Sequence, residues 1–483
     1  MPESLKATTL RNVSYNSLAT VIHLVVMAAA NIILTRTLAP SDYGIVGFAA
    51  IFTAFLSQFS DLGIGSAVVQ KKELEQRELY TAFTIKFVIG LVIFVLAFLG
   101  APLAVRVFDN PAIVEVIRVL ALNFVLNTFG ILPSILLTRN LDYKKIAMAN
   151  LIPAILQSAV AVIMALMGFK YWSLVIASLV MSLSSCVMIN ILHPVRYRIA
   201  FSRDAAASFI RFGGNVFLAG LIVFLIFNAD NFLIGAVKGA TDLGYYSLAF
   251  NWGSMACTMI ASIVLSVLFP TFSKMQGDRE RLKNSYLKVL QYISFGGVLV
   301  NMTLFVVSRD FLFLVLGHHT DKWLPALTSL RILCFYGVAR LLLEPVGQVV
   351  MALARTDVLR QANLLAAALE LTGLYPSLHF MGIEGVALLV TVSYMAQYAL
   401  YYRCLRSELQ ISFKELRSCI GPALWGMLVL SQLFLLGEVC RESSYIVFII
   451  KLIGCTAGYL VTYGVASRWR LYRELRSLAN NSI

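Results

Sequence analysis

Long apolar segments alternate with short polar segments along almost the whole chain. Each apolar segment has about 20 residues, the length that an α-helix needs to cross the hydrocarbon core of a bilayer. The pattern predicts an all-α integral membrane protein with about fourteen transmembrane helices. The predicted helices occupy residues 13–35, 43–69, 79–104, 112–137, 146–167, 171–192, 209–235, 242–269, 286–307, 324–353, 358–378, 381–402, 418–437 and 444–465.

The composition excludes a water-soluble globular protein. The 483 residues are 59% hydrophobic and only 13% charged, and the mean hydropathy is +0.81. Soluble domains carry about 25% charged residues, so this much apolar surface requires lipid. The first apolar segment continues through Ile32 and Leu34, too far for a signal peptide, and we expect an uncleaved first helix.

The net charge of +14 does not come from one basic patch, which argues against a nucleic-acid partner. The 39 Lys and Arg residues fall mainly in short clusters between apolar segments, as in the cytoplasmic loops of membrane proteins. A cytoplasmic N-terminus places most of these clusters inside, and both termini are then cytoplasmic. The inside clusters fall within residues 71–77, 139–145, 196–211, 274–288, 355–360, 403–417 and 468–476.

Motifs for metals, cofactors and catalysis are not evident. The seven cysteines are scattered without CxxC spacing, which favours neither a disulfide framework nor a zinc site. The pair His318 and His319, with Asp321, lacks the spacing of a structured metal site. No GxxxxGK[ST] loop or common hydrolase motif occurs, so we expect no cofactor, no ATP hydrolysis and no enzymatic activity.

Two segments 200 residues apart resemble each other. Asn31, Asp42, Gly44 and Ala49 of the first segment match Asn231, Asp242, Gly244 and Ala249 of the second without a gap. This predicts an internal repeat of six helices. An even number gives both copies the same orientation, as in transporters with parallel repeats and a substrate cleft between two lobes. The predicted parts are an N-terminal lobe (1–200), a C-terminal lobe (201–410), and two further helices with a tail (411–483).

Several motifs resemble those of one transporter family. They include residues 37–44 (TLAPSDYG), 61–70 (DLGIGSAVVQ), 138–145 (TRNLDYKK), 228–235 (NADNFLIG), 244–250 (GYYSLAF) and 268–270 (LFP). In order and spacing the chain resembles the Wzx-type polysaccharide flippases of the multidrug/oligosaccharidyl-lipid/polysaccharide exporter superfamily, and is most similar to the colanic-acid-type branch.

The resemblance implies a function. The substrate would be an undecaprenyl-diphosphate-linked oligosaccharide, moved from the cytoplasmic to the periplasmic leaflet by alternating access, for exopolysaccharide, capsule or O-antigen (lipopolysaccharide) synthesis. It also implies the bacterial inner membrane as location, and membrane lipid, a polysaccharide polymerase and a co-polymerase as partners. Two alternatives remain open: a multidrug/cation antiporter of the same superfamily, and a membrane polysaccharide polymerase or ligase.

Ionisable residues inside the apolar segments are the candidate site, because each costs about 2.5–3.5 kcal/mol to insert at mid-bilayer. Arg340, Glu344 and Gln348 share one face of the tenth helix, and arginine binds diphosphate well. The substrate-cavity candidates are Arg340, Glu344, Gln348, Asp230, Asn228, Asn231, Arg118, Glu370, Lys86 and Arg331. Asp230 and Glu344 are candidates for coupling an ion, and Asp61, Asp42 and Asp242 are structural or gating candidates.

Each candidate also has a structural interpretation. Arg340 and Glu344 could form an ion pair that only joins helices, and Asp230 could be a polar clamp between helices. Arg118 could extend to the outer surface, and we expect the same of Lys451 in the last helix. The cations of residues 274–288 either rest on anionic lipid or attract the diphosphate.

Overall fold

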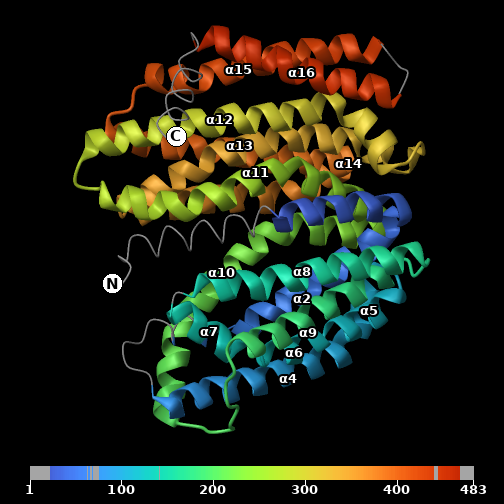
Figure 1. Cartoon of the computed structure of the whole chain (residues 1–483), viewed down its shortest axis with the longest axis vertical. Helices are drawn as coiled ribbons and strands as arrows, with labels where there is room; N and C mark the ends of the chain where they lie inside the picture. Colours follow the sequence, from blue (N-terminus) through green and yellow to red (C-terminus); the bar gives the residue numbers. More distant parts are fainter. Residues whose placement is uncertain are drawn as a thin grey trace. The chain divides into compact units, whose positions relative to one another are not determined.

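The computed structural model describes residues 22–61, 64, 65, 68, 75–140, 142–439 and 444–467. Within these residues the chain forms helices and no strands (Figure 1). This confirms the all-α prediction. The residues 13–21 of the first predicted helix lie outside the described part, and a helix occupies Ile22–Thr37.

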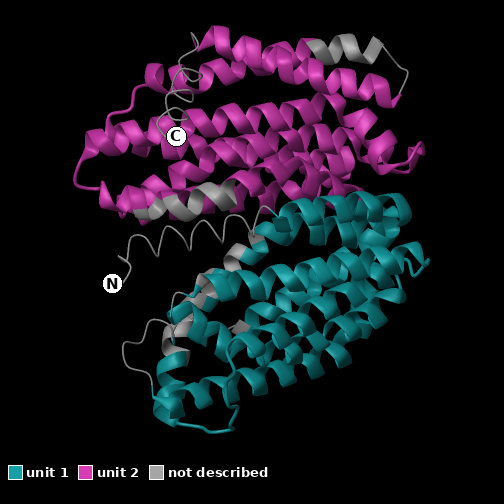
Figure 2. Cartoon of the chain, in the orientation of Figure 1, with its two compact units in different colours: residues 1–244 teal, residues 245–483 magenta. Residues whose placement is uncertain are grey.

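Two compact units divide the chain, residues 1–244 and residues 245–483 (Figure 2). The division falls inside helix α11, Ala240–Lys274, so this helix belongs to both units. The first helix of the predicted C-terminal lobe, α10, lies in unit 1, where it packs against α2 and α4. The lobe boundaries at residues 200 and 410 stay predictions.

Unit 1 contains helices that pack mainly through small and branched apolar side chains. Helix α8 packs along α9, and α4 contacts α2, α5, α6 and α10 (Figure 1). After the unlabelled first helix, the unit comprises α2 (Pro40–Asp61), α4 (Gln76–Phe108), α5 (Ala112–Leu120), α6 (Leu122–Thr128), α7 (Ile131–Arg139), α8 (Tyr143–Leu166), α9 (Trp172–Leu192) and α10 (Arg203–Lys238).

Unit 2 is built around α12, which contacts α13, α14, α15 and α16. The C-terminal pair α15–α16 therefore forms part of this unit (Figure 1). Its helices beyond α11 are α12 (Arg279–Asp310), the π-helix η1 (Phe311–Leu316), the 3₁₀-helix η2 (Asp321–Ala326), α13 (Leu327–Ala352), α14 (Thr356–Leu409), α15 (Phe413–Val439) and α16 (Tyr445–Ala466).

Helix α14 is a hairpin of two spans. Its 54 residues would extend about 80 Å as one helix, against a hydrocarbon core of about 30 Å. Gly382 breaks it with φ 65° and ψ −150°, a conformation that suits glycine. On either side of the break, Ser393 Oγ donates to Glu370 Oε1 at 2.6 Å, so the two arms lie side by side. This agrees with the separate predicted helices at 358–378 and 381–402.

The fourth predicted span, 112–137, is broken rather than continuous. Helices α5, α6 and α7 occupy it, and the part up to Thr128 meets α7 at an angle of 49°. Among the described residues, eight helices are long and apolar enough to cross a membrane, or nine if this bent segment counts as one. With α14 holding two spans, these numbers are consistent with about fourteen, which stays a prediction.

The proposed repeat is visible in local structure. In the first copy, the helix Ile22–Thr37 is followed after a two-residue break by α2, which begins at Pro40. In the second copy, α10 ends at Lys238 and α11 begins at Ala240, after the single residue Gly239 with φ 86°. Both copies thus place a helix-turn-helix at matching positions, 200 residues apart.

Candidate functional site

Unit 1 contains a polar cavity of about 300 Å³. It lies between α2, α4 and the α5–α7 segment, and polar side chains from α2 and α6 line it together with Lys86 of α4. The lining residues are Ala50, Thr53, Ala54, Ser57, Ser60, Lys86, Leu120, Asn123, Phe124, Asn127, Thr128 and Ile131. A polar cavity among membrane helices is a place where a hydrophilic group can leave water at reduced cost.

Lys86 is the cation of this cavity. Its side chain is buried, with 6% of the residue exposed, and Nζ donates to the carbonyl oxygen of Ser60 at 2.8 Å. Because burying a charge is costly, a lysine at this place needs polar partners, which the cavity supplies. Lys86 is one of the substrate-cavity candidates from the sequence, and its position in the lining of this cavity supports that hypothesis.

Asn123 and Asn127 line the same cavity, and the sequence analysis did not select them. Asn123 Nδ2 lies 3.4 Å from Ser178 Oγ, and Asn123 Oδ1 is buried without a hydrogen-bond partner in the structure. Their signal was present in the sequence, because two amides four residues apart inside an apolar run lie on one helix face. Neither amide is charged, so the cost of burying a charge does not single them out.

In unit 2, Arg340 and Glu344 lie on one face of α13, as predicted. Arg340 Nε is 3.6 Å from Glu344 Oε1, and their side chains are 28% and 27% exposed. Gln348 continues the same face one turn further and is also partly exposed, whereas Leu341, Val346 and Val349 are buried. The polar face is therefore only partly covered within unit 2.

Two tyrosines extend this polar face. Arg340 Nη1 lies 3.4 Å from the hydroxyl of Tyr336, one turn earlier on α13. The ring of Tyr336 packs edge-to-face on Tyr394 of α14, with ring centroids 4.8 Å apart. Tyr336 is only 1% exposed, so it supports the Arg340 guanidinium from the core, and Arg340 and Glu344 are the accessible groups of this face. The tyrosines were missed, since aromatic residues in an apolar segment normally indicate core packing.

Glu370 lies in the core of unit 2. It is 5% exposed and accepts the 2.6 Å hydrogen bond from Ser393, which is fully buried. This hydrogen bond joins the two arms of α14 in the core of unit 2.

Asp230, Asn228 and Asn231 lie together near the end of α10, in unit 1. Asp230 is buried, and its Oδ1 accepts from the backbone N–H and the side-chain amide of Asn231 at 2.7 and 3.0 Å. Asn228 instead donates to the carbonyl of Phe224 within the helix. Asp230 and Asn231 are therefore hydrogen-bonded to each other while Asn228 is not part of this contact, and a role in coupling an ion stays a prediction.

Arg118 and Arg331 do not join either polar surface. The Arg118 guanidinium stacks over the Phe98 ring at 4.7 Å, and its Nε donates to the Phe98 carbonyl at 3.2 Å. Arg331 Nε donates to Ser308 Oγ at 3.1 Å, near the end of α12. Arg118 thus connects α4 with α5, and Arg331 connects α12 with α13. A role of either arginine in the substrate cavity stays a prediction.

The prediction for Lys451 was wrong. Its Nζ points into unit 2 and forms a 2.7 Å ion pair with Asp310 at the end of α12. The Asp310 side chain is 5% exposed and that of Lys451 is 17% exposed. The predicted ninth helix ended at residue 307, so Asp310 was counted as part of an outer loop and its buried partner was not foreseen.

The three structural candidates differ. Asp42 is buried and its Oδ2 accepts from the backbone N–H of Ala39 at 2.9 Å, so it caps the start of α2. Asp242 lies at the matching place in the first turn of α11. Asp61 ends α2, and its side chain lies outside the described residues.

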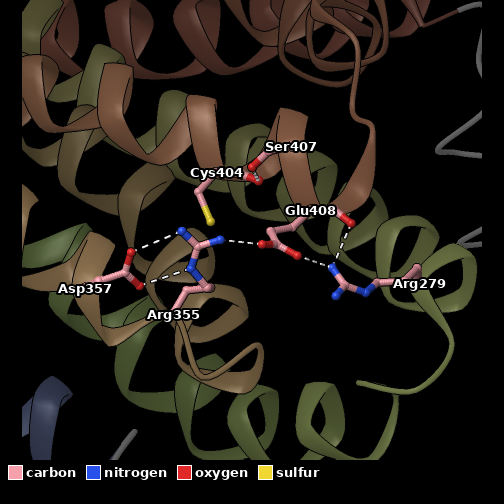
Figure 3. A network of polar contacts seen from close by, with 6 residues as sticks. All are labelled: Arg279, Arg355, Asp357, Cys404, Ser407 and Glu408. Carbon is pink, nitrogen blue, oxygen red and sulfur yellow. Dashed lines mark hydrogen bonds and ion pairs between the residues drawn. The ribbon is translucent and has the colours of Figure 1, made fainter.

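Charged side chains also connect several helix ends of unit 2 (Figure 3). The Arg355 guanidinium forms two parallel 3.0 Å bonds with Asp357 and also contacts Glu408. Glu408 in turn accepts from Arg279 Nη1 at 2.5 Å. The nearby pair of Lys283 and Glu415 is separated by 2.7 Å. Arg279 and Lys283 thus already have carboxylate partners, which weakens the idea that they attract a diphosphate.

Among the described residues, no group of three or more His, Cys, Asp or Glu side chains is placed to hold a metal ion. His318 and His319 both have positive φ angles, and the ring of His319 packs against Phe313 and Tyr445. The pair is therefore engaged with aromatic side chains.

The sequence profile described as "Polysaccharide biosynthesis protein" matches residues 33–328. The chain belongs to this family of polysaccharide biosynthesis proteins. The chain is 27% identical over 391 residues to the lipopolysaccharide biosynthesis protein WzxC of Escherichia coli K12, covering 80% of this chain and 78% of that one. This confirms the resemblance to Wzx-type proteins.

Other members and related folds agree. The succinoglycan biosynthesis transport protein ExoT of Rhizobium meliloti is 30% identical over 252 residues, 52% of this chain and 50% of that protein. The lipid II flippase MurJ in an inward closed conformation shares the fold, with a TM-score of 0.76 and 14% identity over 95% of this chain and 99% of that one. An inward-facing multidrug resistance MATE family transporter of the MOP superfamily has a TM-score of 0.62 and 16% sequence identity, covering 82% of this chain and 98% of that one. This family member is thus a multi-pass membrane protein with a MOP-type fold.

Proposed function

We propose that the protein is a flippase that moves undecaprenyl-diphosphate-linked oligosaccharide repeat units from the cytoplasmic to the periplasmic leaflet. The proposal is supported by membership of the polysaccharide biosynthesis family and by relatives named as Wzx and transport proteins. The product would serve exopolysaccharide, capsule or O-antigen synthesis. The protein would act in the inner membrane, with both termini cytoplasmic and a polymerase and co-polymerase as partners.

The observation that carries the proposal is the buried Lys86 in its polar cavity. An anionic head group that leaves water needs a cation in its new surroundings, because the Coulomb interaction must offset the lost hydration. Hydroxyl and amide groups around the lysine suit sugar hydroxyls. Arg340, supported by the hydroxyl of the buried Tyr336, would offer a second cation in unit 2.

The same observation disfavours the alternatives. A cavity whose one charged side chain among the described lining residues is a lysine repels the cationic substrates of a multidrug antiporter. On a separate ground, a polymerase or ligase needs a large extramembrane loop that carries reactive groups, and the longest predicted outside loop, near residues 308–323, is too short. We therefore propose a transporter without catalytic activity of its own.

The test is a deletion of the protein in its host, followed by measurement of lipid-linked repeat units in each leaflet. We expect repeat units to accumulate in the cytoplasmic leaflet and the polymer to disappear. Wild-type chain, Arg340→Gln, Asp230→Ala and Arg118→Gln are then returned at equal membrane levels. Arg340→Gln and Asp230→Ala should fail to restore polymer, whereas Arg118→Gln should restore it. Unchanged leaflet distribution in the deletion strain would refute the flippase.

A further inference from the structure

The segment that joins α9 to α10 is extended and attached to unit 1. It covers residues 193–202 and contains no helix. Two backbone N–H groups fix it to the start of α4: that of Ala200 donates to Thr84 Oγ1 and that of Ser202 donates to Thr81 Oγ1, each at 3.1 Å. These bonds fix the segment against α4, so the exposure of its side chains is a defined property of the fold.

Tyr197 anchors the middle of the segment. Its hydroxyl lies 2.5 Å from Asn190 Oδ1 and also contacts the Phe129 carbonyl oxygen. Its ring packs against Phe83 of α4 at 4.9 Å and against Phe129 at 5.9 Å. Tyr197 thus connects three parts of unit 1, and its neighbours in the extended segment face the other way.

The exposed side chains of the segment include both cations and large apolar groups. Arg196, Arg198 and Arg203 are exposed, and within the described part of the chain none of them has an ion-pair or hydrogen-bond partner. Ile199 is 78% exposed and Phe201 is 60% exposed. Large apolar side chains exposed beside several arginines are typical of a segment at the membrane interface, where apolar groups enter lipid and cations meet head-group phosphates.

We propose that residues 196–203 form an interfacial contact with anionic phospholipid. Arg196, Arg198 and Arg203 would bind the phosphate groups, and Ile199 and Phe201 would enter the adjoining acyl region. The pattern requires both the phosphate groups and the acyl region, because phosphate alone would pair with the arginines and leave Ile199 and Phe201 in water. The interface between head groups and acyl chains offers both environments within a few ångströms. The proposal does not depend on what the protein transports.

The test compares the full-length protein and three variants in native mass spectrometry, with added phosphatidylglycerol or phosphatidylcholine. The arginine variant is Arg196→Gln with Arg198→Gln, and the apolar variant is Ile199→Ser with Phe201→Ser. The control is Arg106→Gln with Lys170→Gln, which removes the same charge from exposed positions on the predicted opposite side. Monodisperse elution in size-exclusion chromatography is checked first for each.

The arginine variant should bind phosphatidylglycerol more weakly by about fivefold for each arginine removed, with phosphatidylcholine binding unchanged. The control should match wild type. The apolar variant should lose affinity for both lipids. Should one double variant fail to fold, the other still tests the contact.

Inorganic pyrophosphate separates a lipid surface from a site for a free or sugar-linked diphosphate. Under the proposal, pyrophosphate displaces little phosphatidylglycerol and the arginine variant leaves pyrophosphate binding unaltered. Loss of pyrophosphate binding in the arginine variant, with phosphatidylglycerol retained, would overturn the proposal. Equal phosphatidylglycerol loss in the control variant would overturn it as well.

Discussion

The carbonyl oxygen of Ala240 lies where a side chain on residue 44 would have to begin. A Cβ atom built on Gly44 would be 1.7 Å from that oxygen, and one built on Gly244 would be 1.9 Å from the carbonyl oxygen of Pro40. The four residues are equivalent in pairs by the 200-residue repeat. The starts of α2 and α11 therefore cross through backbone atoms in a reciprocal contact, which glycine alone permits.

Gly44→Ala should destabilise the protein strongly. The obstructing atom belongs to the backbone and cannot swing away, so the helices must separate, and overpacking of this kind costs about 1–3 kcal/mol or more. The thermal unfolding midpoint of the purified protein in detergent measures the effect. Gly100→Ala is the matched control, because a Cβ there meets nothing within 4 Å. Equal midpoints for the two variants would show that the crossing is not as tight as described.

Lys451→Met should be among the more damaging changes in unit 2. It leaves the Asp310 carboxylate, 5% exposed, without its 2.7 Å partner, and such losses cost about 3–5 kcal/mol. Adding Asp310→Asn should recover much of the stability, because no uncompensated charge then remains. Lys170→Met, at an exposed position, serves as control. A Lys451→Met protein as stable as this control would contradict the buried ion pair.

Lys86→Met should strongly reduce polymer production while the protein still reaches the membrane. A hydrogen bond to a charged group contributes about 1.5–3 kcal/mol, so its loss predicts about a tenfold to hundredfold drop in transport. Polymer yield and membrane-fraction immunoblots give the two readouts. Lys144→Met, at an exposed position of α8, controls for loss of a positive charge. Transport at the wild-type rate would remove Lys86 from the site.

The Glu415 carboxylate makes a pH-dependent contribution to stability. It precedes the predicted span 418–437, and bonds from the Lys283 ammonium and from Ser412 lower its pKa to about 2 from 4.5. A lowered folded-state pKa gives stability that is present above pH 4.5 and lost as the pH falls toward 2. The side chain is 38% exposed, so the effect is modest.

Glu415→Gln should therefore lower the unfolding midpoint slightly at pH 7. The gap to wild type should close between pH 4.5 and pH 2, a window set by the lowered pKa. Glu280→Gln, which changes an acidic residue in the first turn of α12, is the control for the general pH response. A gap that widens on acidification would reverse the sign of the argument.

The sequence determined the class of the protein and the approximate positions of most described helices, whereas the break within the predicted span 112–137 appears only in the structure. Apolar length is a property of the chain itself, and in lipid each backbone must satisfy its own hydrogen bonds as a helix. The repeat follows from residue identities 200 positions apart, and the shared face of Arg340 and Glu344 follows from helical spacing. Tertiary structure decided which charge meets which partner. Three contacts that join different helices show this: Lys451 pairs with Asp310, Arg118 stacks on Phe98, and Lys86 lines a cavity together with Asn123. No local sequence pattern encodes which residues of different helices come into contact.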